Sequence, residues 1–137
     1  MSDALTLSGA QAVAQAVLDQ AGEAGFALAL AIVDLGGWSL VQLRMDGAFP
    51  AAVDAAHAKA RAAALYRRPT SDFSARVKQG MPLAHLPHVV PLGGGVLLER
   101  DGIPIAAMGV SGAREDTETA LAETVAAAFA AGAIKVS

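Results

Sequence analysis

The chain has 137 residues, about the size of one domain, with 10 basic and 13 acidic residues and a formal net charge of −3. It contains no cysteine, which excludes disulfides, thiolate nucleophiles and cysteine-ligated metals. The longest apolar run, residues 26–33, is much shorter than the roughly 20 residues of a membrane helix. The first residues do not resemble a signal peptide. We therefore expect one domain, residues 1–137, in the cytoplasm and without a membrane partner.

The first predicted elements are a helix and two strands. Residues 8–24 place apolar side chains at helical spacing, and Ser8 is the expected cap. Residues 26–34, FALALAIVD, alternate large with small apolar side chains, which predicts a strand covered on both faces. The large side chains would face a bulky core, and the small ones would let another layer lie close. After a turn at residues 35–37, residues 38–45 predict a second strand of an antiparallel hairpin.

The second half of the chain predicts helices around another hairpin. Residues 51–66 predict a helix that ends before Pro69, and residues 71–78 predict a shorter one. Residues 81–95 hold three prolines and three glycines, as an irregular loop would. An Asp-Gly turn marks a hairpin within residues 96–112, and an acidic first turn opens a helix over residues 116–131. Paired hairpins separated by helices predict an α+β domain with an antiparallel sheet.

Positive charge is concentrated in the middle of the chain. Residues 51–80 carry six basic and two acidic residues, a local net charge of +4. This segment suits a small anion better than a nucleic acid, which would need a larger patch interleaved with aromatic residues. A solvated helix face is the alternative interpretation.

Four stretches carry a family resemblance. They are VDLGGWSLVQLRMDGAF, AHAKARAAALYRRPT, GGGVLLERDGIPIAAMGVSGA and the acidic entry into the last helix. In this order they resemble the GlcG/HbpS family, which includes the C-terminal domain of PduO-type proteins. The resemblance implies a profilin-like fold, with about five antiparallel strands covered by helices on both faces, and a homo-oligomer. The fifth strand would come from residues 81–92 or from the tail AIKVS. Because relatives include haem-binding proteins, haem is a candidate cofactor.

Several residues could carry chemistry where the second predicted strand ends. Arg44 could bind a carboxylate, while Asp46 could orient a partner or accept a proton. Gly47 would belong to the same ligand-binding loop. The alternative is that both charges are ordinary edge residues and that Gly47 only supplies a turn.

The second predicted helix carries further candidates. Asp54, His57 and Arg61 lie on one ridge, because residues three and four apart are neighbours on a helix. Asp54 could set the tautomer of His57, leaving its other nitrogen for a proton, a metal or haem iron. Lys59 points elsewhere, matches the family's lysine and could bind an anion. As structure alone, the ridge would be a solvated helix edge.

Two histidines and two glycine turns complete the candidates. His85 and His88 could ligate a divalent metal or haem if a third ligand converged, or they could make only loop contacts. The ligand-binding candidates in the glycine turns are Gly94, Gly95, Gly109, Ser111 and Gly112. Residues 109–112 precede a helix, where free backbone N–H groups attract carboxylate or phosphate. Tight strand-to-helix packing is the alternative.

Two hypotheses about function follow. The first is a ligand-binding protein for a small carboxylate or a tetrapyrrole such as haem, with its site between the 44–47 loop, the second helix and the glycine turns. The second is a small-molecule enzyme, such as an isomerase or lyase, that transfers protons on a carboxylate or carbonyl substrate. Its acids and bases would come from Asp46, His57, Lys59 and His85.

Overall fold

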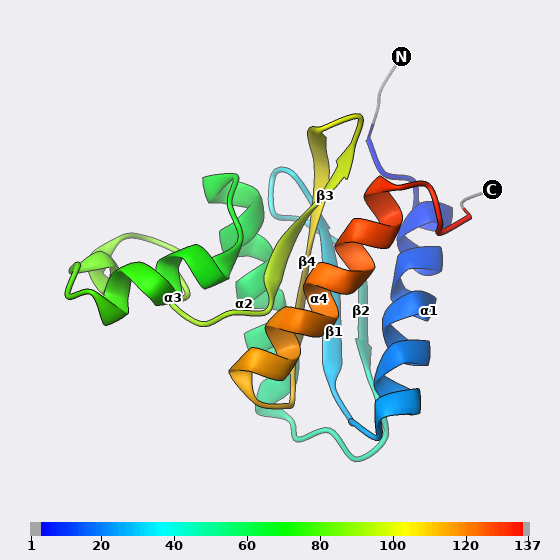
Figure 1. Ribbon diagram of the computed structural model, residues 1–137, viewed down its shortest axis with the longest axis horizontal. Coiled ribbons are helices and arrows are strands. Elements are labelled where there is room, and N and C mark those ends of the chain that lie inside the picture. The colour runs from blue at the N-terminus through cyan, green and yellow to red at the C-terminus, as the bar shows by residue number, and fades with distance from the viewer. Residues whose placement is uncertain (1–3, 136–137) are drawn as a thin grey trace.

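The computed structural model describes residues 4–135, which form a sheet between two layers of helices (Figure 1). The elements in chain order are α1 (Leu7–Ala24), β1 (Ala29–Asp34), β2 (Ser39–Arg44), α2 (Ala51–Tyr66), α3 (Thr70–Lys78), the 3₁₀ helix η1 (Leu83–His85), β3 (Gly95–Arg100), β4 (Ile103–Ser111) and α4 (Glu115–Ala130). The strands pair antiparallel in the order β2-β1-β4-β3. The predicted α+β architecture is confirmed.

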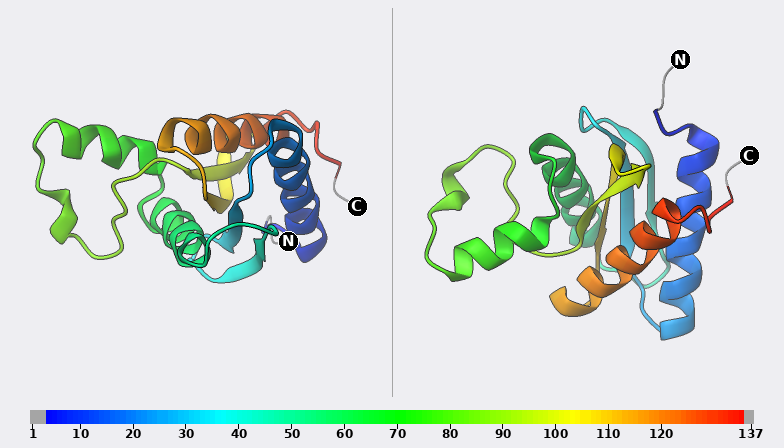
Figure 2. Two further views of the ribbon diagram at one scale, coloured as in Figure 1. Left: turned by 90° about the horizontal axis from the view of Figure 1, so that it is seen from below. Right: turned by 45° about the horizontal axis from the view of Figure 1, so that its top comes forward.

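The alternation along β1 divides the sheet into a bulky face and a smooth face. Leu30 and Ile32 are fully buried in a core that α1 and α4 cover. Ala29 and Ala31 point to the opposite face, where they pack against the alanines of α2. Figure 2 shows α2 alone on one side of the sheet and α1 with α4 on the other. Small side chains on both partners explain why α2 packs so closely.

Gly109 of β4 marks the closest approach between α2 and the sheet. A Cβ atom at this position would lie 2.1 Å from the carbonyl oxygen of Ala56 and 2.6 Å from the amide nitrogen of Ala60. Any side chain would therefore push the helix backbone away from the sheet. The lack of a side chain at Gly109 fixes the position of α2, and with it the positions of the candidate residues that α2 carries.

The structure differs from the expectation in strand number. The described residues form four strands, whereas the family resemblance implies about five. Residues 81–92 contain η1 and otherwise irregular backbone, since their three prolines cannot donate to a strand ladder. Residues 133–135 of the tail form no strand, and residues 136–137 lie outside the described residues.

The cap of α1 also differs from the expectation. The helix begins at Leu7, and Thr6 caps it by accepting a hydrogen bond from the amide of Gly9 at 3.0 Å. Ser8 lies inside the first turn. Among the described helices, none combines the length and the apolar character that a membrane span needs.

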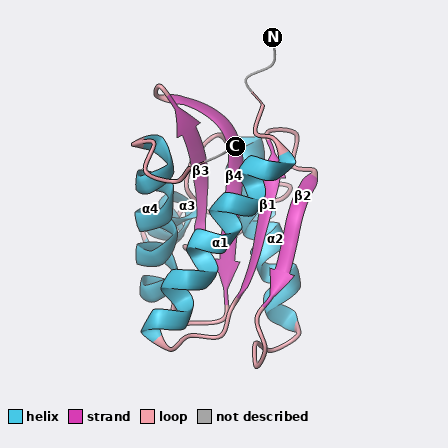
Figure 3. Cartoon of the chain, turned by 90° about the vertical axis from the view of Figure 1, so that its right-hand side faces the viewer, coloured by secondary structure: helices cyan, strands magenta, loops and turns pink. Residues whose placement is uncertain are grey.

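The segment from α3 to β3 projects from the body of the molecule (Figure 1). The hydroxyl of Tyr66 donates a hydrogen bond to the carbonyl oxygen of Pro87 at 2.6 Å, which ties the end of α2 to this projecting segment. At the opposite side, β2 forms an edge of the sheet, flanked by α1 on one face and α2 on the other (Figure 3).

Candidate functional site

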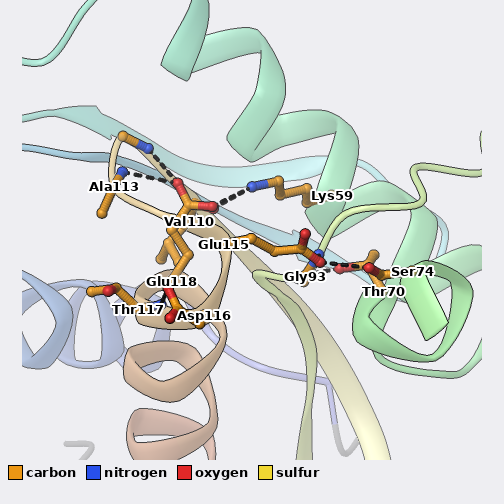
Figure 4. Close-up of polar contacts among 12 residues, drawn as sticks. Lys59, Thr70, Ser74, Gly93, Val110, Ala113, Glu115, Asp116, Thr117 and Glu118 are labelled. Carbon is orange, nitrogen blue, oxygen red and sulfur yellow. Dashed lines mark hydrogen bonds and ion pairs between the residues drawn. The ribbon is translucent and has the colours of Figure 1, made fainter. Parts of the chain in front are cut away.

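Lys59 forms an ion pair inside the protein. Its side chain is 3% exposed, and its Nζ lies 2.9 Å from Oε1 of Glu118 on α4. Figure 4 shows this contact between Lys59 and Glu118. The same ammonium donates a hydrogen bond to the carbonyl oxygen of Val110 at 3.2 Å. Two acceptors therefore compensate a charge that burial alone would strongly disfavour. The pair joins α2 to α4 through the end of β4.

The second oxygen of Glu118 holds the bend between β4 and α4. Oε2 accepts hydrogen bonds from the amides of Gly112 at 2.7 Å and Ala113 at 2.9 Å. The amide of Gly112 is one of the N–H groups that the sequence offers to an external anion. In the structure a carboxylate of the chain itself accepts from it. Lys59 and the 109–112 bend thus lie together, and their polar groups are bonded within the protein.

The other glycine turn packs against the same lysine. A Cβ at Gly94 would lie 2.7 Å from the oxygen of Val110, and one at Gly95 would lie 2.5 Å from the oxygen of Lys59. The amide of Gly95 donates to Oγ1 of Thr70 at 2.8 Å in a buried position. This close packing agrees with the structural interpretation of the glycines. A ligand role for Gly94, Gly95, Gly109, Ser111, Gly112 and Lys59 stays a prediction.

Glu115 anchors the base of the projecting segment. Its Oε2 accepts hydrogen bonds from the hydroxyl of Ser74 at 2.6 Å and from the amide of Gly93 at 2.8 Å (Figure 4). These bonds, the one from Ser74 above all, hold the pKa of Glu115 below its ordinary value. The ammonium of Lys78, 3.8 Å from the other carboxylate oxygen, acts in the same direction. The sequence predicts only an acidic first turn here, and no local pattern indicates that Glu115 and Glu118 bond residues so distant in the chain.

Carboxylates neutralise most of the basic segment. Arg68 and Arg76 both pair with Asp72, at 3.1 and 3.2 Å. Lys59 and Lys78 pair with the two glutamates of α4. Arg61 and Arg67 form no ion pair within residues 4–135, so the net charge of this segment overstates the positive charge available to an anion.

Arg44, Asp46 and Gly47 are exposed at the end of β2. Arg44 is opposite Ala29 in the β1–β2 ladder, and Ala29 is opposite Ser111 in the β1–β4 ladder. Because directly opposed residues share a face, the side chain of Arg44 lies on the α2 face of the sheet. It forms no ion pair with the described residues. Gly47 has a φ of +88°, which fits the turn predicted there.

His57 and Arg61 lie along the β2 side of α2. The guanidinium of Arg61 lies 5.8 Å from the centroid of the Trp38 ring, just before β2 begins. His57 is half-buried one turn earlier on the same side of the helix, because residues four apart are neighbours. We call Trp38, Arg44, His57 and Arg61 the α2–β2 margin. It combines an imidazole, two guanidinium groups without acidic partners among the described residues, and an indole that is 70% exposed.

His85 and His88 are both exposed on the projecting segment. His88 has a φ of +64°, a left-handed conformation that non-glycine residues seldom adopt. Among residues 4–135, no group of three or more His, Cys, Asp or Glu side chains could hold a metal ion. The third ligand that the sequence hypothesis required is therefore not supplied by these residue types in the described chain.

Comparison with known proteins gives a consistent result. A family model described as "Haem degrading protein HbpS-like" matches residues 5–127. Protein GlcG of Escherichia coli is 36% identical over 103 residues, which cover 74% of this chain and 77% of GlcG.

Two solved structures show the same fold. The structure of a double mutant of HbpS from Streptomyces reticuli matches with a TM-score of 0.84 and 36% identity, covering 94% of this chain and 89% of that one. The structure of a PduOC:haem complex matches with a TM-score of 0.82 and 30% identity, covering 91% of this chain and 94% of that one.

Proposed function

The chain belongs to the HbpS-like family, and on that premise we propose that it binds a tetrapyrrole such as haem. The similarity to a protein solved as a haem complex supports this proposal, since it extends over 91% of the present chain. The description of the family model, which also names haem, supports it further.

The α2–β2 margin is the part of the described chain that fits such a ligand best. Haem supplies an iron that takes an axial ligand such as imidazole, and two propionates that favour guanidinium partners. His57 would provide the imidazole, and Arg61 or Arg44 the cation. The two guanidiniums belong to opposite ends of β2, since Trp38, beside Arg61, precedes the strand and Arg44 ends it. The observation that carries the proposal is that these guanidiniums have no acidic partner among residues 4–135, although Arg68 and Arg76 nearby in the chain do.

The surface grooves of the described chain fit haem less well than this margin does. Three surface grooves of about 490, 390 and 460 Å³ are lined by no histidine. The first has Lys78 and Arg114 beside three acidic residues, which would repel propionates. The haem iron would therefore find its imidazole on open surface rather than in one of these grooves.

A small carboxylate would use the same cations and compete with haem. Proton-transfer catalysis draws less support, because Lys59 is buried in an ion pair, and Asp46 and His85 are exposed on separate segments, after β2 and in η1. A homo-oligomer and a cytoplasmic location complete the proposal. The exposed apolar side chains of β2 and its flanks support the oligomer.

Titration of the purified chain with haemin tests the proposal. We expect a saturable Soret band with a Kd of about 10 μM or tighter. Replacing both Arg44 and Arg61 by alanine should weaken binding about tenfold or more, because charge-assisted bonds to the propionates are lost. Arg114→Ala, which removes an exposed guanidinium elsewhere, is the matched control and should bind like the wild type. Millimolar or unsaturable binding by the wild type would refute the proposal.

A further inference from the structure

The outer edge of β2 is open. No segment of the described chain pairs with it, whereas α3 and α4 lie beside β3 at the opposite edge (Figure 3). An open edge presents a row of unpaired backbone N–H and C=O groups, and proteins usually protect it with lysine, proline or inward-pointing charge. Residues 40–43, Leu-Val-Gln-Leu, contain none of these, and the two protective features of β2, Arg44 and a register shift at Leu40, lie toward its two ends. We propose that β2 pairs antiparallel with β2 of a second copy of this chain, giving one sheet that continues through both copies.

The surroundings of this edge favour a second copy as the occupant. A groove of about 460 Å³ runs between α1 and β2, and none of its nine lining residues is charged. Leu7 of α1 and Leu43 of β2 are its most exposed apolar side chains, at 55% and 40%. The cores of protein interfaces are depleted of charge in this way. In a two-fold dimer the same patch of both copies meets at the interface. A patch of one charge would therefore repel its own copy, whereas the uncharged groove does not.

Symmetry restricts the register of the pairing. With a two-fold axis perpendicular to the sheet, opposed residues of the two copies must lie on the same face. Residues on the same face of a strand are an even number of positions apart, so the axis passes through a residue position and not between two residues. Val41 and Leu43 lie on the α1 face, and Gln42 lies on the α2 face, as their partners Ile32, Leu30 and Ala31 show.

Within the bounds of β2, Ser39–Arg44, axes at Gln42 and Val41 give the longest pairings. The Gln42 axis opposes Leu40 to Arg44, and on the α1 face it opposes Val41 of each copy to Leu43 of the other, which gives two apolar pairs. These two apolar pairs would join the two α1–β2 grooves. An axis at Val41 would oppose Val41 to itself and Leu43 to Ser39, so the α1 face would keep one apolar pair instead of two.

The pairing would also bring two α2–β2 margins onto one face of the continuous sheet. Arg44, His57 and Arg61 of each copy would then border a single trough whose floor is the two β2 strands. This consequence rests on the proposed haem function, whereas the pairing itself does not. A ligand with two carboxylates could be shared between guanidiniums of both copies.

A cysteine scan tests the register directly, because the chain has no cysteine of its own. Gln42→Cys would place two thiols opposite each other across the axis, with Cα atoms about 4.5–5.5 Å apart, within disulfide range. Arg44→Cys is the matched control on the same face. Its two copies would be roughly 13 Å apart along the strands and should not form a disulfide. Mild oxidation followed by non-reducing electrophoresis should give a covalent dimer for Gln42→Cys only. Equal or no crosslinking of the two variants would overturn the proposal.

A charge introduced at the edge tests the interface without a crosslink. Leu43→Lys should lower the mass measured by light scattering from a multiple of 13.8 kDa to that of one chain. Leu65→Lys is the matched control, since Leu65 is 38% exposed on α2 and should leave the mass unchanged. A wild-type monomer, or an oligomer that Leu43→Lys does not affect, would refute the pairing. Haemin binding by the Leu43→Lys monomer would separate the two proposals: lost pairing with retained affinity leaves the haem site within one chain.

Discussion

Replacing Lys59 by methionine should strongly destabilise the fold. Methionine keeps a similar length, but it leaves the carboxylate of Glu118, 5% exposed, without its cation. Breaking a buried pair by removing one partner costs about 3–5 kcal/mol. We expect the lower end, about 3 kcal/mol, because the amides of Gly112 and Ala113 still donate to Glu118. Urea unfolding should show a lower midpoint with an unchanged slope.

The reverse change and a matched control sharpen this prediction. Glu118→Gln should cost more than Lys59→Met, because no carboxylate then neutralises the buried ammonium, and the single amide oxygen of glutamine must serve either Lys59 or the amides of Gly112 and Ala113. Lys78→Met removes the other lysine that pairs with α4, but Lys78 is 72% exposed, so the change should cost about 1 kcal/mol or less. If Lys59→Met were as mild as Lys78→Met, the buried pair would not hold α2 to α4 and our reasoning would be wrong.

Two further predictions concern packing and pH. Gly109→Ala should destabilise the protein by about 1–3 kcal/mol or more, because the new Cβ would meet the backbone of α2. In the control Gly22→Ala the new Cβ meets nothing within 4 Å, so this change should stabilise the protein by up to about 1 kcal/mol. The urea midpoints of both variants check this. Because folding lowers the pKa of Glu115 below 4.5, its contribution to stability is present above pH 4.5 and is lost as pH falls through the folded pKa. Glu115→Gln should therefore flatten the fall of the urea midpoint below pH 5, and an unchanged slope would contradict the assignment.

Much of the fold could be predicted because local patterns report on burial. The alternation of residues 26–34 identified a strand with one bulky and one smooth face, and both faces are as expected. Gly109 indicated tight strand-to-helix packing as one of two interpretations, and in the structure its backbone packs against that of α2. The strand number implied by the resemblance differed, since residues 81–92 contain prolines that no ladder accommodates.

The candidate site was harder to predict because its contacts are distant in sequence. Lys59 and Glu118 are 59 positions apart, and no local pattern indicates that one would neutralise the other. The net charge of residues 51–80 suggested a segment suited to an anion, with a solvated helix face as the alternative, whereas the fold pairs four of its six cations with carboxylates. Arg44 is exposed and Arg61 is half-buried, and neither guanidinium has an acidic partner among residues 4–135.

The most direct test of our account is the Soret spectrum of haemin-saturated His57→Ala, measured beside His85→Ala and His88→Ala. If the α2–β2 margin holds the iron, His57→Ala alone should lose or shift the band, and the other two variants should match the wild type. A wild-type spectrum for His57→Ala, with the band lost in His85→Ala or His88→Ala, would place the iron on the projecting segment and contradict the account.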